Sequence, residues 1–171
     1  MKVMKEVIPR EVIKAGLAAA WEMPLATLHN GSPRIVTVFF VAAEDLSSLY
    51  WLSKPHRVHS KDIDGDPEAG TKPEPHVSAG FTFRDRDGVV GLTVMGLARV
   101  VTDLQVAEGV MESYVPKYDV GEHFCANLAD GENLHNLYEM QVSEMDLFDE
   151  HTFTGKIHLI PDEIVERQTN N

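Results

Sequence analysis

The stretch LATLHNGSPRIVTVFFV, residues 25–41, decides the fold class of this chain. Its centre, Asn30-Gly31-Ser32-Pro33, has the composition of a tight turn, because asparagine and glycine tolerate a positive φ. The segment after the turn is rich in β-branched and aromatic residues, which favour extended strands. The stretch therefore predicts a β-hairpin with strands at 25–29 and 34–41.

Further segments repeat this pattern of short apolar runs between turns. Asp85–Gly88, with the sequence Asp-Arg-Asp-Gly, suits the connection of a second hairpin. Helices are predicted at 9–21, in a short segment capped by Ser53, and in a segment that Asp103 caps and Pro116 ends. Strands are predicted at 25–29, 34–41, 49–52, 76–84, 89–101, 137–147 and 152–160, while 119–135 stays unassigned.

Strands joined by hairpins predict a mainly β (α+β) fold with an antiparallel sheet. Closing that sheet into a barrel removes its exposed edges, and the few short helices then flank the barrel. Four aromatic residues, Trp21, Phe39, Phe40 and Trp51, are candidates for the core or for a subunit interface, and the core is the expected place for each. With 171 residues and no linker, a single domain is expected over 1–171, with 1–8 and 161–171 as peripheral tails.

The composition excludes several classes of protein. A net charge of −12 disfavours broad nucleic-acid contact, because phosphate backbones need an extended positive surface. No apolar run approaches the length of roughly 18 residues that a membrane span needs, and the N-terminus lacks a signal-peptide pattern. A cytoplasmic protein without a membrane partner is therefore expected. Cys125 has no second cysteine to pair with, and we expect it to be a small buried residue.

One basic run stands out against this acidic background. Residues 52–63, LSKPHRVHSKDI, place five cationic or titratable side chains before the first carboxylate. A strand that leads into a helix here would present unpaired N–H groups, and Ser53, Arg57, His59 and Lys61 would complete a receptor for a phosphate. On the local sequence alone a solvated basic turn is the preferred interpretation, and the phosphate receptor stays open beside it.

Metal binding is the weaker interpretation of the same region. The acidic residues that begin at Asp62 resemble a calcium loop, but Pro67 and Pro73 stand where that loop needs glycine and glutamate. His56 and His59 have a spacing that suits a metal, yet no third ligand is evident nearby. We therefore predict no metal site.

The order of these features resembles the pyridoxamine 5′-phosphate oxidase-like family of FMN-binding split β-barrels. The resemblance covers about residues 23–160. MPLATLHNGSPRIVTVFF resembles the opening hairpin of the family, and LYWLSKPHRVHSKDI resembles its third strand and phosphate-binding turn. HVSAGFTF, GLTVMGLARVVTD and LYEMQVSEMDLFDEHTFTGK resemble the later strands and the turn before a Gly-Lys. The connection from 64 to 75 is longer than is usual in the family.

The resemblance implies an antiparallel split β-barrel, FMN as the cofactor, and a site formed between the two subunits of a homodimer. Carried over by position, it places one group of residues near the flavin and its ribityl chain and another at the phosphate. The first group is Arg34, Val36, Thr37, Val38 and Thr93; the second is Ser53, Arg57, His59 and Lys61.

Two functions of different classes follow. The first is an FMN-dependent oxidoreductase that acts on an unidentified small molecule and takes electrons from a donor such as a nicotinamide. The second is a non-catalytic split-barrel protein that binds flavin, haem or a related ligand. Because a flavin carries out redox chemistry through its own ring, the sequence singles out no catalytic side chain.

Overall fold

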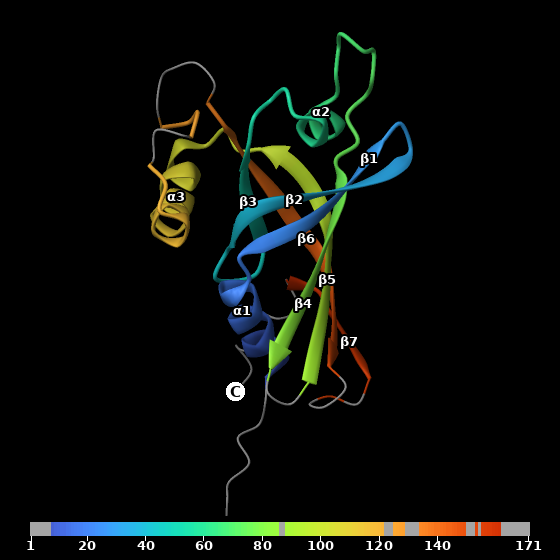
Figure 1. Cartoon of the computed structure of the whole chain (residues 1–171), viewed down its shortest axis with the longest axis vertical. Helices are drawn as coiled ribbons and strands as arrows, with labels where there is room; N and C mark the ends of the chain where they lie inside the picture. The colour runs from blue at the N-terminus through green and yellow to red at the C-terminus, as the bar shows by residue number, and fades with distance from the viewer. Residues whose placement is uncertain are drawn as a thin grey trace, which may run out of the picture.

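The structure, a computed structural model, describes residues 8–85, 88–121, 125–128, 134–149, 153 and 155–161. These residues form most of the elements expected from the sequence (Figure 1). The elements are α1 (Pro9–Ala19), β1 (Glu22–His29), β2 (Ser32–Ala42), β3 (Ser48–Ser53), α2 (Val58–Asp64), β4 (His76–Asp85), β5 (Gly88–Val100), α3 (Leu104–Tyr118), β6 (Asn136–Asp149) and β7 (Lys156–Leu159).

The hairpin of β1 and β2 has the turn that its sequence predicts. Asn30 and Gly31 both have a positive φ, of 51° and 76°, as the two central residues of a tight hairpin turn require. The flanking residues His29 and Ser32 face each other across the ladder. The turn therefore occupies two residues, and β2 begins two residues earlier than predicted.

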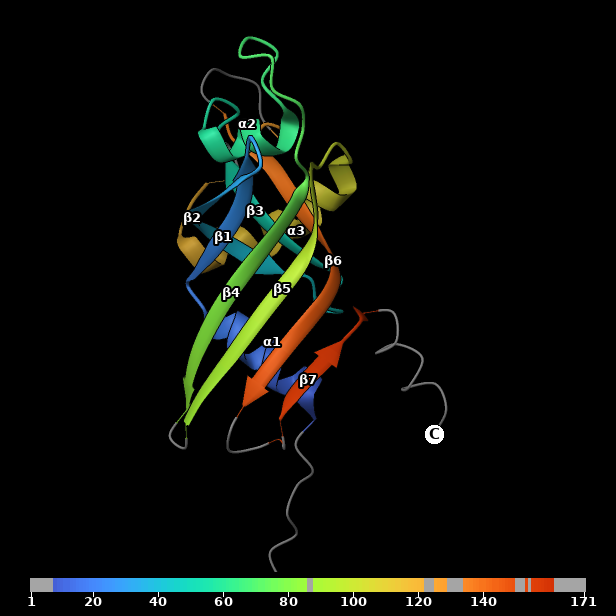
Figure 2. The same cartoon turned by 90° about the vertical axis from the view of Figure 1, so that its right-hand side faces the viewer.

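The sheet closes on itself, which confirms the predicted antiparallel barrel. The strand order is β3-β2-β1-β4-β5-β6, and β3 pairs with the first half of β6, from Ser48↔Gln141 to Ser53↔Asn136. The second half of β6 pairs instead with β7, from Met145↔Leu159 to Phe148↔Lys156. One edge of β6 thus serves two strands in succession, and Figure 2 shows β7 continuing beside the lower part of β6.

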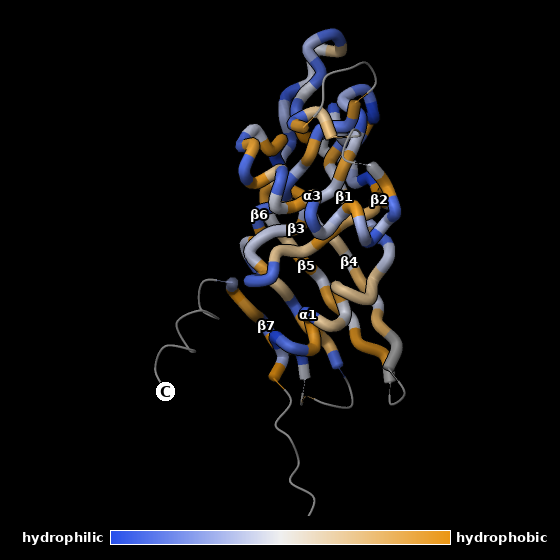
Figure 3. Tube along the Cα trace, turned by 90° about the vertical axis from the view of Figure 1, so that its left-hand side faces the viewer, coloured by the Kyte–Doolittle hydropathy of each residue, from blue (hydrophilic) through white to orange (hydrophobic). Residues whose placement is uncertain are grey.

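Apolar side chains fill the barrel and the space beneath α3. Phe40 and Trp51 are fully buried inside the barrel, as predicted, and Trp51 stacks on Tyr138 at a centroid distance of 5.6 Å. Cys125 lies in a second cluster under α3, so its expected burial is confirmed. The loop after α2, at the upper end in Figure 3, is by contrast mostly hydrophilic.

The helices differ from their predicted bounds where tertiary contacts intervene. Asp103 caps α3 as expected and accepts hydrogen bonds from the backbone N–H groups of Gln105 and Val106 at 2.8 and 3.2 Å. The predicted end at Pro116 is wrong, because α3 continues to Tyr118 and its last turn is bonded to β2. Within the described ranges, none of the helices has both the length and the apolar character needed to cross a membrane.

The predicted cap of α2 is also wrong. Ser53 stays in β3 and pairs with Asn136, whereas α2 begins at Val58 with Arg57 as its N-cap. No side chain caps this helix. The residues between Ser53 and Val58 form a turn closed by a 3.0 Å bond from the Arg57 N–H to the Lys54 carbonyl.

Candidate functional site

A single groove contains most of the side chains that the sequence singled out. It runs along β2, the end of β3 and the start of α2, and α3 contributes to one wall. Its volume of about 520 Å³ falls within the range of small-molecule sites. This β2 groove is lined by Arg34, Val36, Thr37, Val38, Phe39, Leu52, Ser53, Lys54, Arg57, Val58, His59, Tyr114 and His135.

The charge lining the β2 groove is entirely positive. Arg34 comes from β2, while Lys54 and Arg57 come from the turn after β3. Among the described residues, no aspartate or glutamate lines the groove. In a chain with a net charge of −12, this arrangement favours an anionic ligand over a neutral or cationic one.

His59 is held in the groove by two serine hydroxyls. Its Nε2 lies 2.7 Å from the Ser53 Oγ, and Ser60 donates a hydrogen bond to that Oγ over 2.9 Å. The Ser53 hydroxyl can donate to Nε2 when the neutral ring carries its proton on Nδ1, and it can accept from Nε2 in the other tautomer. Burial lowers the pKa of His59, and the neighbouring arginines lower it further against the opposing effect of Asp62.

Two predicted site residues lie outside the β2 groove of a single subunit. Lys61 points to the loop after α2, where its Nζ forms an ion pair with Asp66 at 2.7 Å. Thr93 is exposed on β5, paired with Gly80 and Asp146, and lines a separate shallow depression. Their contact with a cofactor stays a prediction, as do the roles assigned to the residues inside the groove.

Several residues of the groove were not predicted as site residues. Lys54 belongs to the basic run of residues 52–63, and its positive charge could have identified it as a site residue. Tyr114 lies on α3; its ring is buried, and burial raises its pKa. His135 lies in the segment left unassigned, where no periodic pattern identified an element.

The prediction that Trp21 and Phe39 belong to the core is wrong. Their exposed fractions are 55% and 46%. Both rings instead pack against Tyr118 of α3, at centroid distances of 5.1 and 4.8 Å. Phe39 points outward because it alternates along β2 with the buried Val38 and Phe40. The result is an aromatic surface beside the β2 groove.

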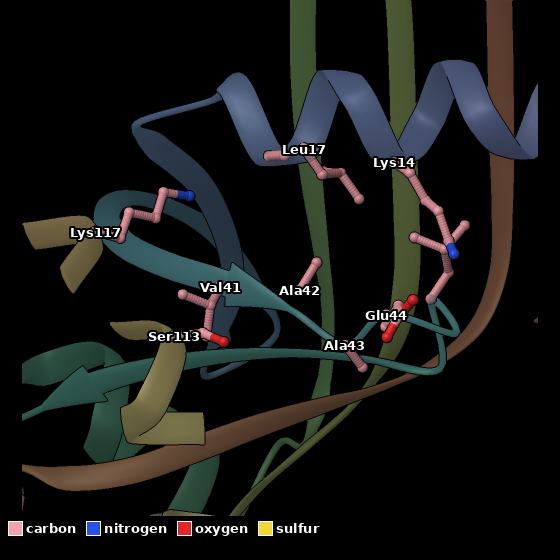
Figure 4. Close-up of a pocket in the computed structure, with 10 residues that line it drawn as sticks. Lys14, Leu17, Val41, Ala42, Ala43, Glu44, Ser113 and Lys117 are labelled. Atoms are coloured by element: carbon pink, nitrogen blue, oxygen red, sulfur yellow. The ribbon is translucent and has the colours of Figure 1, made fainter. Parts of the chain in front are cut away.

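A second cavity, shown in Figure 4, lies between α1, the end of β2 and α3. Its volume is about 390 Å³, and Lys14, Glu44 and Lys117 provide its charged side chains. Lys117 is already engaged, since its Nζ donates to the Phe40 carbonyl at 3.1 Å and lies 4.5 Å from the Phe40 ring centroid. With a carboxylate in its wall, this cavity suits an anion less well than the β2 groove.

Among the residues of the calcium-like pattern, Asp62 turns inward, whereas Asp64 and Glu68 are exposed. Asp62 is buried against the β1–β2 hairpin, and Asp64 accepts a 2.6 Å hydrogen bond from Tyr138. Partial burial raises the pKa of the Asp64 carboxyl, against the effect of that bond. Across the described part of the chain, no three His, Cys, Asp or Glu side chains converge as metal ligands would.

No model of a known protein family matches this chain, and neither does any curated protein sequence. Solved structures do match. A haem-binding protein from Mycobacterium smegmatis has a TM-score of 0.68 at 13% identity, with 91% of this chain and 60% of that protein covered. A candidate pyridoxamine 5′-phosphate oxidase from Listeria innocua has a TM-score of 0.58 at 14% identity, with 81% and 97% covered.

A flavocytochrome from Azotobacter vinelandii gives a similar result, with a TM-score of 0.56 at 13% identity and coverage of 87% and 77%. These proteins share a fold with this chain although few of their residues are identical. The chain therefore has the split-barrel fold of pyridoxamine 5′-phosphate oxidase-like proteins, as its sequence pattern predicted.

Proposed function

We propose that this protein binds FMN in the β2 groove and acts as an FMN-dependent oxidoreductase on a small molecule. The observation that carries the proposal is the charge of the groove: Arg34, Lys54 and Arg57 line it, and none of the described lining residues is a carboxylate. Flavin and haem binding are stated for proteins of the same fold, which adds support. The cytoplasmic location expected from the sequence is part of the same proposal.

The side chains that line the groove suit both the phosphate and the ring system of FMN. Arg57 and His59, with the Ser53 hydroxyl, would hold the phosphate, while Val36 and Val38 offer apolar surface to the rest of the molecule. We also assign Arg34 to the phosphate, although the family resemblance placed it near the flavin and ribityl chain, because it lines the same groove as Arg57. Charge-assisted hydrogen bonds contribute about 1.5–3 kcal/mol each, whereas association costs about 4–15 kcal/mol. A free phosphate would therefore bind weakly. Tight binding would need the further contact of an attached ring with the apolar wall of the groove. When bound, FMN supplies the redox chemistry through that ring.

We further propose that a second copy of the chain completes the site. Beside the β2 groove, the large apolar side chains Trp21, Ile35 and Phe39 are 55%, 72% and 46% exposed in the single subunit. Apolar surface of this kind next to a ligand groove is typical of a subunit interface. A homodimer would bury this surface and exclude water from the proposed flavin position.

The double substitution of Arg57 and His59 by alanine tests the phosphate assignment. Removing two charge-assisted bonds of about 1.5–3 kcal/mol each should weaken FMN binding by about 100-fold or more. Lys72→Ala provides the comparison, because Lys72 is an exposed cation in the loop after α2 and lies outside the groove and outside the predicted site. We expect it to retain FMN like the parent protein. Equal FMN affinity in the double variant and the parent would contradict the proposal.

The alternative is a protein that binds flavin or haem without catalysis. It is favoured by one observation: a solved structure of the same fold is that of a haem-binding protein. The absorption spectrum of the purified protein separates the two functions. An oxidoreductase should be yellow and bleach with NADH, NADPH or a reduced electron-transfer protein. A coloured protein that no donor reduces would favour the binding function, and a colourless protein that rejects FMN would contradict both.

A further inference from the structure

Asp62 is a buried carboxylate that the proposed function does not yet use. Its side chain is 1% exposed, and it lies on α2 beneath the β1–β2 hairpin. One carboxylate oxygen accepts a hydrogen bond from the Thr27 hydroxyl at 2.8 Å, and the other lies 2.7 Å from the Nδ1 of His29. Its backbone carbonyl accepts a 2.8 Å bond from the Glu74 N–H, which connects it to the long loop.

The third polar neighbour of Asp62 is Arg34, which lines the β2 groove. The closest approach is 4.0 Å, between the Arg34 Nε and an Asp62 oxygen. A buried carboxylate strongly favours a nearby cation, because its charge is poorly solvated. At this distance the two groups form an ion pair without a direct hydrogen bond. Because Nε is the nitrogen that approaches Asp62, the two terminal amino groups stay available for another partner, and those groups grip a phosphate in a bidentate manner.

We infer that Asp62 is a positioning residue, which holds the Arg34 guanidinium oriented into the β2 groove so that it can bind the phosphate of the ligand. The inference rests on the proposed function. A free arginine side chain loses about 2 kcal/mol of rotamer entropy when it is fixed. A carboxylate that orients Arg34 before the ligand arrives reduces the part of that cost that falls on binding.

Asp62→Asn tests this role with little change of shape. The amide retains an oxygen that can accept from Thr27, but it removes the negative charge that attracts Arg34. FMN and riboflavin, which lacks the phosphate, are titrated against each variant, and binding is followed by flavin fluorescence. We expect the Kd of FMN to rise about 10-fold and the Kd of riboflavin to stay unchanged, because only the phosphate contacts Arg34.

Glu68→Gln is the control, since it also converts one carboxylate close to α2 to an amide. Glu68 is exposed in the loop after α2 and lies outside the groove, so neither flavin should bind differently. A purely structural role of Asp62 gives another pattern, in which both flavins lose affinity equally. That pattern, or an unchanged Kd of FMN, would overturn the inference.

A second pair of variants shows whether Asp62 acts through Arg34. If it does, Asp62→Asn should have no further effect on FMN affinity in an Arg34→Ala background. Should Asp62→Asn fail to fold, Arg34→Lys replaces it, because lysine keeps the charge but has no Nε for Asp62 to hold. FMN affinity equal to that of the parent in Arg34→Lys would overturn the inference.

The same titrations keep the two proposals apart. If Arg57→Ala with His59→Ala reduces FMN affinity but Asp62→Asn does not, the phosphate site stands and only the positioning role fails. If the parent protein binds neither flavin, the proposed function itself fails.

Discussion

The Tyr118 hydroxyl connects α3 to β2, and its removal gives a prediction with a defined magnitude. It accepts a hydrogen bond from the Phe40 N–H at 2.9 Å and donates its single proton to the carbonyl of Phe40 at 2.6 Å or that of Trp21 at 2.9 Å. Two bonds therefore form at once. At a net value of about 0.5–1.5 kcal/mol each, and with a buried N–H left unpaired, Tyr118→Phe should lower the free energy of unfolding by about 2 kcal/mol.

Urea denaturation measures this loss as a lower midpoint with an unchanged m-value. The phenylalanine ring keeps the packing against Phe39 and Tyr114, so the hydroxyl alone is tested. Tyr50→Phe is the matched control, because its hydroxyl makes one 3.3 Å bond to Glu139 in a half-buried position. We expect it to cost about 0.5 kcal/mol or less. Equal losses in the two variants would refute the reasoning.

Three further predictions concern the barrel, the groove and the interface. Gly96→Ala should destabilise the protein by about 3 kcal/mol or more in thermal unfolding, because a Cβ at this bulge would lie 2.1 Å from a backbone carbonyl oxygen of β6. Gly80→Ala, with open space around its Cβ, should be neutral or slightly stabilising. NMR titration should give His59 a pKa below its ordinary value of about 6.5 before FMN is added and a higher one afterwards, because burial disfavours the imidazolium and a bound phosphate favours it. The free protein should consequently lose stability as the pH falls from about 6.5 towards that lowered pKa, and His59→Gln should abolish this part of the loss. Ile35→Glu should convert the proposed dimer to a monomer in sedimentation velocity, whereas Val89→Glu, at the far end of the barrel, should not.

Local sequence signals predicted the strands and the first hairpin. They did not predict where α3 ends, because that depends on contacts between segments far apart in the chain. The backbone preferences of Asn30 and Gly31 specify their turn, so the hairpin could be predicted from the sequence. Pro116 is a local helix breaker, yet Lys117 and Tyr118 continue α3 because their side chains bond to the backbone of Phe40. That bond joins residues 78 positions apart, and no local pattern predicts it.

The candidate site likewise combines residues that the sequence indicated with one residue whose role depends on a tertiary contact. The basic turn after β3 was visible because its charges are contiguous in sequence, and Arg34 entered through the family resemblance. Asp62 was read as part of an acidic loop, since a carboxylate followed by further carboxylates resembles a solvated or calcium-binding segment. Its burial depends on α2 packing against β1, where Thr27 and His29 meet it. Sequence spacing gives no sign of that contact.

The acidic surface and the cationic groove act at different ranges, which would explain how a chain with a net charge of −12 can bind the phosphate that we propose. At physiological ionic strength the Debye length is about 8 Å, so remote carboxylates are largely screened from a ligand inside the groove. Arg34, Arg57 and Lys54 line that groove directly and act on the ligand at contact distance. A polyanion such as nucleic acid would extend beyond the groove onto acidic surface, whereas a single phosphate with an apolar body meets only the cations. We therefore expect salt to weaken FMN binding only modestly, and a steep salt dependence would mean that the phosphate lies in exposed solvent instead.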